Sequence, residues 1–288
     1  MLDLKQIEIR IARATTLPIL PDIATTVLAM SDDPDYSARD YERVISRDTA
    51  LTAKILRTAN SPLFGGNGQI TSLQRAITLL GMNTLRSICI AVAFQSSLYN
   101  RRLNRRFDPV HFWQHSMATG CAARVLACIM QCPRSGEAFL AGLLHDIGKL
   151  VLGLYLPEEL DRVYDLMQAK HISQYEAEQI CFDGLTHQDV GRMAAERWNL
   201  PSVYVTPIAK HHNPTEDVFE IDPLTACVHV GNCIAHEIDQ GILTPTLPQD
   251  ADPLVLDFLQ VPEPQYEAIR KAIAREIERC SAIHSRAA

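Results

Sequence analysis

The sequence predicts an all-α protein. Apolar residues recur at helical spacing along most of the chain, and no stretch keeps up the alternation of a half-buried strand. Capping residues and helix breakers also divide the chain into segments of helix length. At 288 residues, 47% of them hydrophobic and 21% charged, the chain is long enough to bury one large core or two smaller ones. We therefore expect a folded helical protein with two lobes that pack against each other.

In the first third of the chain, capping residues and turns mark the expected helices. Ser37 and Asp48 are good N-caps, because their side-chain oxygens can accept bonds from free backbone N–H groups. Gly81 separates two apolar segments. The helices expected here cover residues 23–30, the segment after Ser37, the segment after Asp48, and residues 70–80 and 85–98.

A cluster of arginines predicts the domain boundary. It comprises Arg101, Arg102, Arg105 and Arg106, and it ends at Asp108-Pro109. Charge and helix breakers coincide there, which favours a solvated linker between lobes 1–108 and 109–288. With a net charge of -7 the chain as a whole repels phosphate backbones, so we expect no nucleic-acid partner. Docking of an acidic partner on the arginines stays open.

The second part of the chain carries longer and more apolar helical segments. Thr186 with Asp189 fits a capping box, and Asp222-Pro223 fits an N-cap followed by a first-turn proline. The helices expected here cover residues 112–130, 137–144, the segment after Leu156-Pro157, residues 173–182, the segment after Thr186, and 223–241.

Cysteine usage and hydropathy predict a cytoplasmic protein without a membrane partner. The eight cysteines form no CxxC pair and lie mostly in apolar helical stretches, which argues against a disulfide framework. Residues 1–13 alternate charged and apolar side chains, unlike a signal peptide. The apolar run at residues 150–156 is too short to cross a bilayer.

Histidines gather where the expected segments begin or end. These are His115, His145, His187, His211, His212 and His229. The most informative motif is His145-Asp146, which follows a buried apolar helix and precedes Gly148 and Lys149. A neutral nitrogen and an anionic oxygen at the edge of a core suit Zn, Fe or Mn. Lys149 could then neutralise a bound phosphate.

A single His-Asp pair is more often a polar pair that closes a helix. Together with His115, His187, His211 and His212, however, the pair predicts a metal site or its structural vestige. Another set, His229, Asn232 and His236, is spaced i, i+3 and i+7. The polar face of an amphipathic helix explains that set without a ligand role.

The order of these residues resembles the HD superfamily of metal-dependent phosphohydrolases. His115 matches the first ligand of that family, and His145-Asp146 matches its doublet. Asn232 stands where the resemblance implies a final aspartate, so this ligand position is degenerate and weaker metal binding and hydrolysis are implied.

A subgroup of that superfamily, the HD-GYP enzymes that cleave cyclic di-GMP, is matched only in part. His187, His211 and His212 match its further ligands. No Gly-Tyr-Pro follows them, however, because the chain continues with Asn213-Pro214, and this argues against cyclic di-GMP hydrolysis.

Blocks in the first third resemble the HDOD family. They are residues 17–21, 48–56, 59–64, 70–77 and 80–81, and the resemblance covers roughly residues 10–240. It implies an N-terminal helical lobe packed on an HD-like lobe. It also implies a signalling output module that works with a receiver or another sensor domain.

Two functions follow from these observations. The favoured one is a bacterial-type signal-transduction output module that acts through protein–protein interaction without catalysis; its partners are sensor or receiver domains, and self-association stays open. The alternative is a phosphohydrolase acting on a nucleotide or phosphate ester. In the alternative, His115, His145 and Asp146 hold the metal and Lys149 lies near the phosphate. His187, His211 and His212 would complete a second metal site.

Overall fold

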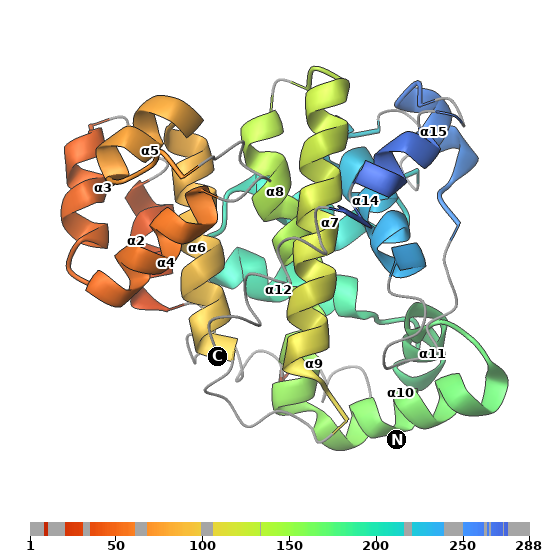
Figure 1. Cartoon of the computed structure of the whole chain (residues 1–288). Coiled ribbons are helices and arrows are strands. Elements are labelled where there is room, and N and C mark those ends of the chain that lie inside the picture. Colours follow the sequence, from red (N-terminus) through yellow and green to blue (C-terminus); the bar gives the residue numbers. More distant parts are fainter. Residues whose placement is uncertain are drawn as a thin grey trace. The chain divides into compact units, whose positions relative to one another are not determined.

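The computed structural model describes residues 9–10, 21–30, 35–60, 68–98, 106–132, 134–215, 221–238, 250–261, 264, 266–272 and 274–275. Within these ranges the regular elements are helices and no strand occurs (Figure 1), so the all-α prediction is confirmed. Contacts divide the chain into two compact units, one built mainly from residues 18–100 and the other mainly from residues 101–269. The lobe boundary at 108/109 and the packing of the two lobes stay predictions.

The smaller unit is a helical bundle around its longest helix. Its helices are α2 (Asp22–Ala29), α3 (Ala38–Ile45), α4 (Thr49–Ala59), α5 (Leu73–Leu80) and α6 (Met82–Leu98). α2, α4 and α5 pack on α6, which contributes the fully buried Leu85, Ile88 and Phe94. The two predicted caps are present: Ser37 forms a capping box with Asp40, and Asp48 accepts the N–H of Leu51.

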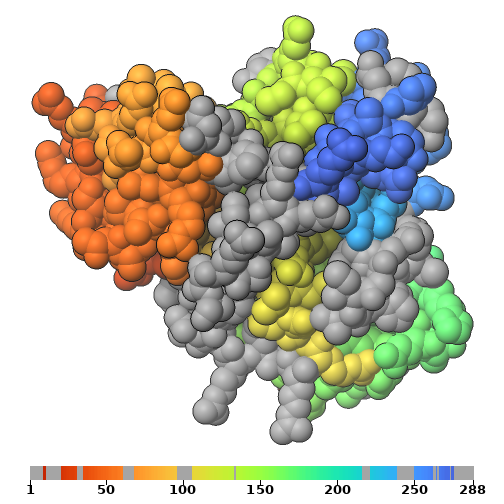
Figure 2. Space-filling view, viewed as in Figure 1, coloured from red at the N-terminus to blue at the C-terminus, as the bar shows by residue number. Residues whose placement is uncertain are grey.

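The larger unit contains the predicted site residues. Its helices are α7 (Pro109–Ile129), α8 (Ser135–Leu144), α9 (Ile147–Tyr155), α10 (Pro157–Lys170), α11 (Gln174–Cys181), α12 (His187–Arg197), α13 (Ser202–Lys210), α14 (Pro223–Ile238) and α15 (Pro253–Phe258). α7 packs against both α8 and α14, and α9 packs against α12 (Figure 1). α15 lies at the surface of this unit (Figure 2), where Leu254 and Phe258 are exposed.

Three helices of the larger unit, α9, α13 and α15, were not predicted from the sequence. α9 follows Asp146, which was assigned to a metal site and not to a helix start, and whose side chain makes no capping bond. α13 contains Pro207 and begins after Pro201, and prolines usually mark the end of a helix. The predicted capping box of Thr186 and Asp189 does open α12.

Two glycines allow helix backbones to touch next to the predicted site. A Cβ on Gly148 of α9 would lie 1.8 Å from the carbonyl oxygen of His187 on α12. A Cβ on Gly142 of α8 would lie 2.8 Å from the Cα of Gly120 on α7. No side chain fits at such separations, so both contacts require glycine. Neither helix contact was predicted from the sequence.

One stretch of the described residues, Ser135–Tyr155, has the length and apolarity of a membrane span. Its most apolar window is 83% buried inside the protein, as expected for core helices. The stretch is also broken between α8 and α9 at His145-Asp146. A cytoplasmic location stays a prediction.

Candidate metal centre

His145 and Asp146 form the junction between α8 and α9 and are fully buried. The Nδ1 atom of His145 lies 2.7 Å from the carbonyl oxygen of Gly142. Because a carbonyl oxygen can only accept, Nδ1 carries the proton and donates it. The Nε2 atom of His145 therefore keeps its lone pair, and it lies 3.3 Å from Oδ2 of Asp146. A backbone carbonyl thus sets the tautomer that a metal ligand needs.

His187, the first residue of α12, is oriented by Glu178 on α11. Oε2 of Glu178 accepts both the backbone N–H of His187, at 2.7 Å, and its Nδ1–H, at 2.6 Å. Both side chains are fully buried. With its proton on Nδ1, His187 directs the lone pair of Nε2 to Oδ1 of Asp146, 3.2 Å away. This role of Glu178 was not predicted from the sequence.

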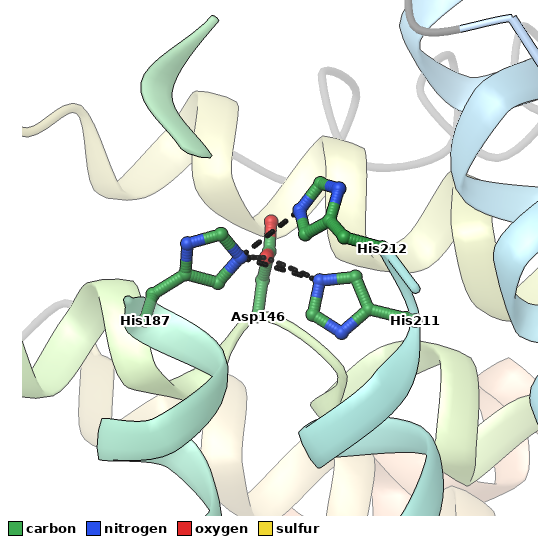
Figure 3. A group of neighbouring side chains, drawn as sticks. All are labelled: Asp146, His187, His211 and His212. Atoms are coloured by element: carbon green, nitrogen blue, oxygen red, sulfur yellow. Dashed lines mark hydrogen bonds and ion pairs between the residues drawn. The ribbon is translucent and has the colours of Figure 1, made fainter. Parts of the chain in front are cut away.

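His211 and His212 follow α13 and complete the group (Figure 3). Nδ1 of His211 lies 3.2 Å from each of the carbonyl oxygens of Pro207 and Ile208, so it too carries the proton. Nε2 of His187 lies 3.2 Å from Nε2 of His211 and 3.1 Å from Nε2 of His212. Nitrogen atoms from three histidines therefore converge in front of Asp146 (Figure 3).

His115 approaches the other carboxylate oxygen of Asp146 from α7. Its Nε2 atom lies 3.6 Å from Oδ2. Although His115 is buried, neither of its ring nitrogens has a hydrogen-bond partner among the described residues. Asp146 is thus shared by two potential ligand groups, one with His115 and His145 and one with His187, His211 and His212. In each group the ligand atoms lie within 4.8 Å of one another.

Burial keeps most of these histidines neutral. It lowers the pKa of His211 to about 3, and it lowers the pKa values of His115 and His212 well below their usual value. Burial also lowers the pKa of His187, but the carboxylates of Glu178 and Asp146 together outweigh this effect and the net shift is upward. Neutral imidazole is the form that binds a metal.

The carboxyl group of Asp146 stays ionised. Burial opposes ionisation, but His145 and Lys149 outweigh it and hold the pKa of Asp146 well below its usual value. Lys149 contributes an ammonium nitrogen 2.6 Å from Oδ2. The centre therefore combines an anionic oxygen with the neutral nitrogens of His115, His211 and His212, a donor set that suits Zn, Fe or Mn.

The residues present fit a metal ion. Nε2 of His187 faces Nε2 of His211, and both rings carry their protons on Nδ1. Two lone pairs about 3 Å apart repel each other unless a proton or a metal cation lies between them, and a metal cation can take the place of the proton that the raised pKa of His187 favours. The buried, unbonded nitrogens of His115 are likewise costly without such a partner.

A cavity of about 180 Å³ opens onto one side of the centre. Its polar wall includes His115, Asp146 and Lys149, together with His111 and His236. The rest of the wall is Arg106, Phe107, Asp108, Phe112, Tyr164, Met167 and Gln174. A small ligand in this cavity would lie against Asp146 and between cationic and aromatic side chains.

Asn232 and His229 of α14 are both buried but have different surroundings. Asn232 is buried, and its Oδ1 atom has no hydrogen-bond partner among the described residues. His229 lies inside α14, so its assignment to a helix end was wrong. Its Nδ1 donates to the carbonyl oxygen of His211 at 2.7 Å, and its Nε2 accepts the N–H of Asp252 at 3.0 Å. His229 thus supports the backbone that carries His211.

Comparisons with known proteins agree with this fold. An uncharacterized protein of Treponema pallidum (strain Nichols) is 26% identical over 228 residues, which is 79% of this chain but only 44% of that relative. The chain therefore spans less than half the length of the curated relative it matches.

Several solved structures have the same fold. An HDOD domain protein with unknown function from Geobacter sulfurreducens is 23% identical with a TM-score of 0.72, covering 97% of this chain and 95% of that one. A candidate phosphohydrolase from Shewanella amazonensis is 21% identical with a TM-score of 0.72, covering 94% and 96%. A candidate signal transduction protein from Marinobacter aquaeolei is 23% identical with a TM-score of 0.70, covering 93% and 59%. The profile of the HDOD domain matches residues 17–214, more than half of the chain, and this protein therefore belongs to the HDOD domain family.

Proposed function

We propose that this protein is a signalling module whose larger unit binds divalent metal and, next to the metal, a phosphate-bearing small molecule. The observation that carries the proposal is the convergence of the Nε2 atoms of His187, His211 and His212 in front of an ionised Asp146. Hydrogen bonds fix the orientation of the rings before any ion binds, so little order has to be created on binding.

The ligand class follows from the cavity. A bound ion would supply positive charge next to Lys149, and Arg106 adds a further cation on the cavity wall. Phosphate is the small anion that such clustered charge favours. Phe107, Phe112 and Tyr164 give the same cavity an aromatic wall, which favours a ligand with a flat apolar part, such as a nucleoside phosphate.

The output of the module is proposed to be protein–protein interaction. Ligand binding at the centre would change which surface a sensor or receiver domain meets. The family assignment supports a signalling role, and one protein of the same fold is described as a candidate signal transduction protein.

Hydrolysis of a phosphate ester is a second candidate function. Lys149 favours it, because its ammonium group lies at Asp146 and on the cavity wall, within reach of a phosphate group bound there. Asn232 weighs against it, because an amide brings no negative charge to the place where the HD superfamily has an aspartate.

The proposal is tested by calorimetry on the full chain, first with Mn²⁺ or Zn²⁺ and then with inorganic phosphate or AMP. We expect phosphate binding only after metal loading, and we expect Lys149→Gln to weaken it. Lys170→Gln, at the exposed end of α10, is the matched control. Equal phosphate binding with and without metal would overturn the proposal, and release of phosphate from AMP would favour the second candidate.

A further inference from the structure

We propose that His236 is a ligand of the metal position formed by His115, His145 and Asp146, in the role that Asn232 cannot fill. This inference rests on the metal centre proposed above. It assigns a function to a histidine that the sequence pattern explained as part of a polar helix face.

The first support is the position of His236 beside His115. Their ring centroids lie 4.5 Å apart, with 41° between the ring planes. Two imidazoles that bind one ion at nitrogen–metal distances of about 2.1 Å place their centroids roughly 4.5 to 5.2 Å apart. His115 and His145, which belong to the same ligand group, have centroids 5.3 Å apart. The centroid spacing of His236 and His115 is therefore in the range of a ligand pair. His236 is not part of the group whose ligand atoms already lie within 4.8 Å of one another, so its ring has to turn toward the ion on binding.

The second support is that the cavity lies beside the ligand group of His115, His145 and Asp146. His115, His145 and Asp146 contribute three ligand atoms, and His115 and Asp146 also line the cavity. A further ligand has to come from the cavity side. His236 lines that cavity and is only half-buried, so its ring can adjust to an ion more easily than a fully buried side chain.

The third support comes from α14 itself. Asn232 and His236 are one helical turn apart and thus share a face of the helix. α14 lies so close to α7 that a Cβ on Gly231 would be 3.0 Å from the backbone of Thr119. This close packing holds the shared face near His115. An imidazole at His236 replaces a weak amide donor with a strong nitrogen donor.

The test measures metal affinity and coordination in the full chain, without any activity assay. Wild type, His236→Gln and His171→Asn are titrated with Co²⁺, followed by visible absorption and by calorimetry. His171 is an exposed histidine at the end of α10, outside the cavity lining, and serves as the matched control. We expect His236→Gln to weaken one Co²⁺ position at least tenfold and to change its absorption bands, with His171→Asn close to wild type.

The outcomes of the Co²⁺ titration separate the role of His236 from the existence of the metal centre. Identical affinity and absorption bands in wild type and His236→Gln would overturn the role of His236 and leave the metal centre intact. No Co²⁺ binding by wild type would overturn the proposed function together with this inference. Asn232→Asp is a second variant: we expect it to restore affinity in the His236→Gln background, and failure to do so would contradict the idea that both residues address one position.

Discussion

The close contact between α9 and α12 gives the sharpest prediction about how the fold builds the centre. In Gly148→Ala, the new Cβ would lie 1.8 Å from the carbonyl oxygen of His187. An ordinary contact is about 3.4 Å, so the two backbones have to separate by about 1.6 Å. His187 would then lose its position 3.2 Å from Asp146.

The expected cost of Gly148→Ala follows from two opposing effects. Overpacking costs about 1–3 kcal/mol, whereas alanine in a helix gains up to about 1 kcal/mol over glycine. We expect a net loss of about 2 kcal/mol in the free energy of unfolding, or a fall in Tm of about 4–8 °C. The displacement of His187 should also weaken metal binding at least tenfold.

The assay is thermal and urea unfolding of the metal-free protein, followed by metal titration. Gly153→Ala is the matched control on the same helix, since its Cβ would meet Phe107 at 3.4 Å, an ordinary contact. We expect this control to be as stable as wild type or up to about 1 kcal/mol more stable. If Gly148→Ala matched the control in stability and in metal affinity, the account of the α9–α12 contact would be refuted.

Three further predictions concern the centre. Glu178→Gln should weaken metal binding by about 10–100-fold at nearly unchanged stability, because His187 loses the charge that orients its ring. Calorimetry measures the metal affinity, and an unchanged affinity would contradict this prediction. Metal-free protein should lose stability as pH falls below about 6.5, because His211 takes up a proton in the unfolded chain but not in the folded one, where its pKa is lowered to about 3. For this group the free energy of unfolding should fall by up to about 1.4 kcal/mol per pH unit. Urea midpoints measured at pH 7 and pH 5 test this. Metal removal by a chelator should lower the Tm of wild type but not that of Asp146→Asn, and equal Tm changes in the two proteins would argue against binding at Asp146.

The helices that were predicted begin at N-capping residues, which can be recognised in the sequence. Ser37, Asp48, Ser173 and Thr186 each accept bonds from the first turn of a helix, and such caps are visible in sequence. α9 also follows an aspartate, but the side chain of Asp146 makes no capping bond and turns its carboxylate toward histidines that come from α7, α8, α12 and the end of α13. His145-Asp146 was assigned to a metal site from the sequence, so the start of α9 was missed.

The ligands that were predicted share a recognisable residue type, and the missed residue does not. Residue type at the expected helix ends, with the resemblance to the HD superfamily and its HD-GYP subgroup, predicts the histidines and Asp146 from the sequence. Glu178 was missed because a single glutamate on an amphipathic helix looks like a surface residue. Only the packing of α11 places it, fully buried, against the ring of His187. His236 has the recognisable residue type but was assigned to a polar helix face, because its closeness to His115 depends on how α14 packs on α7.

The central claim is that Asp146 and the surrounding histidines bind metal, and metal content tests it most directly. The full chain is purified without an affinity tag or added metal and analysed by mass spectrometry, beside Asp146→Ala and the exposed control His171→Asn. The account predicts stoichiometric Fe, Mn or Zn in wild type and control, and its loss in Asp146→Ala. Metal-free wild type that takes up no Fe, Mn or Zn on titration, or equal metal content in all three proteins, would contradict it.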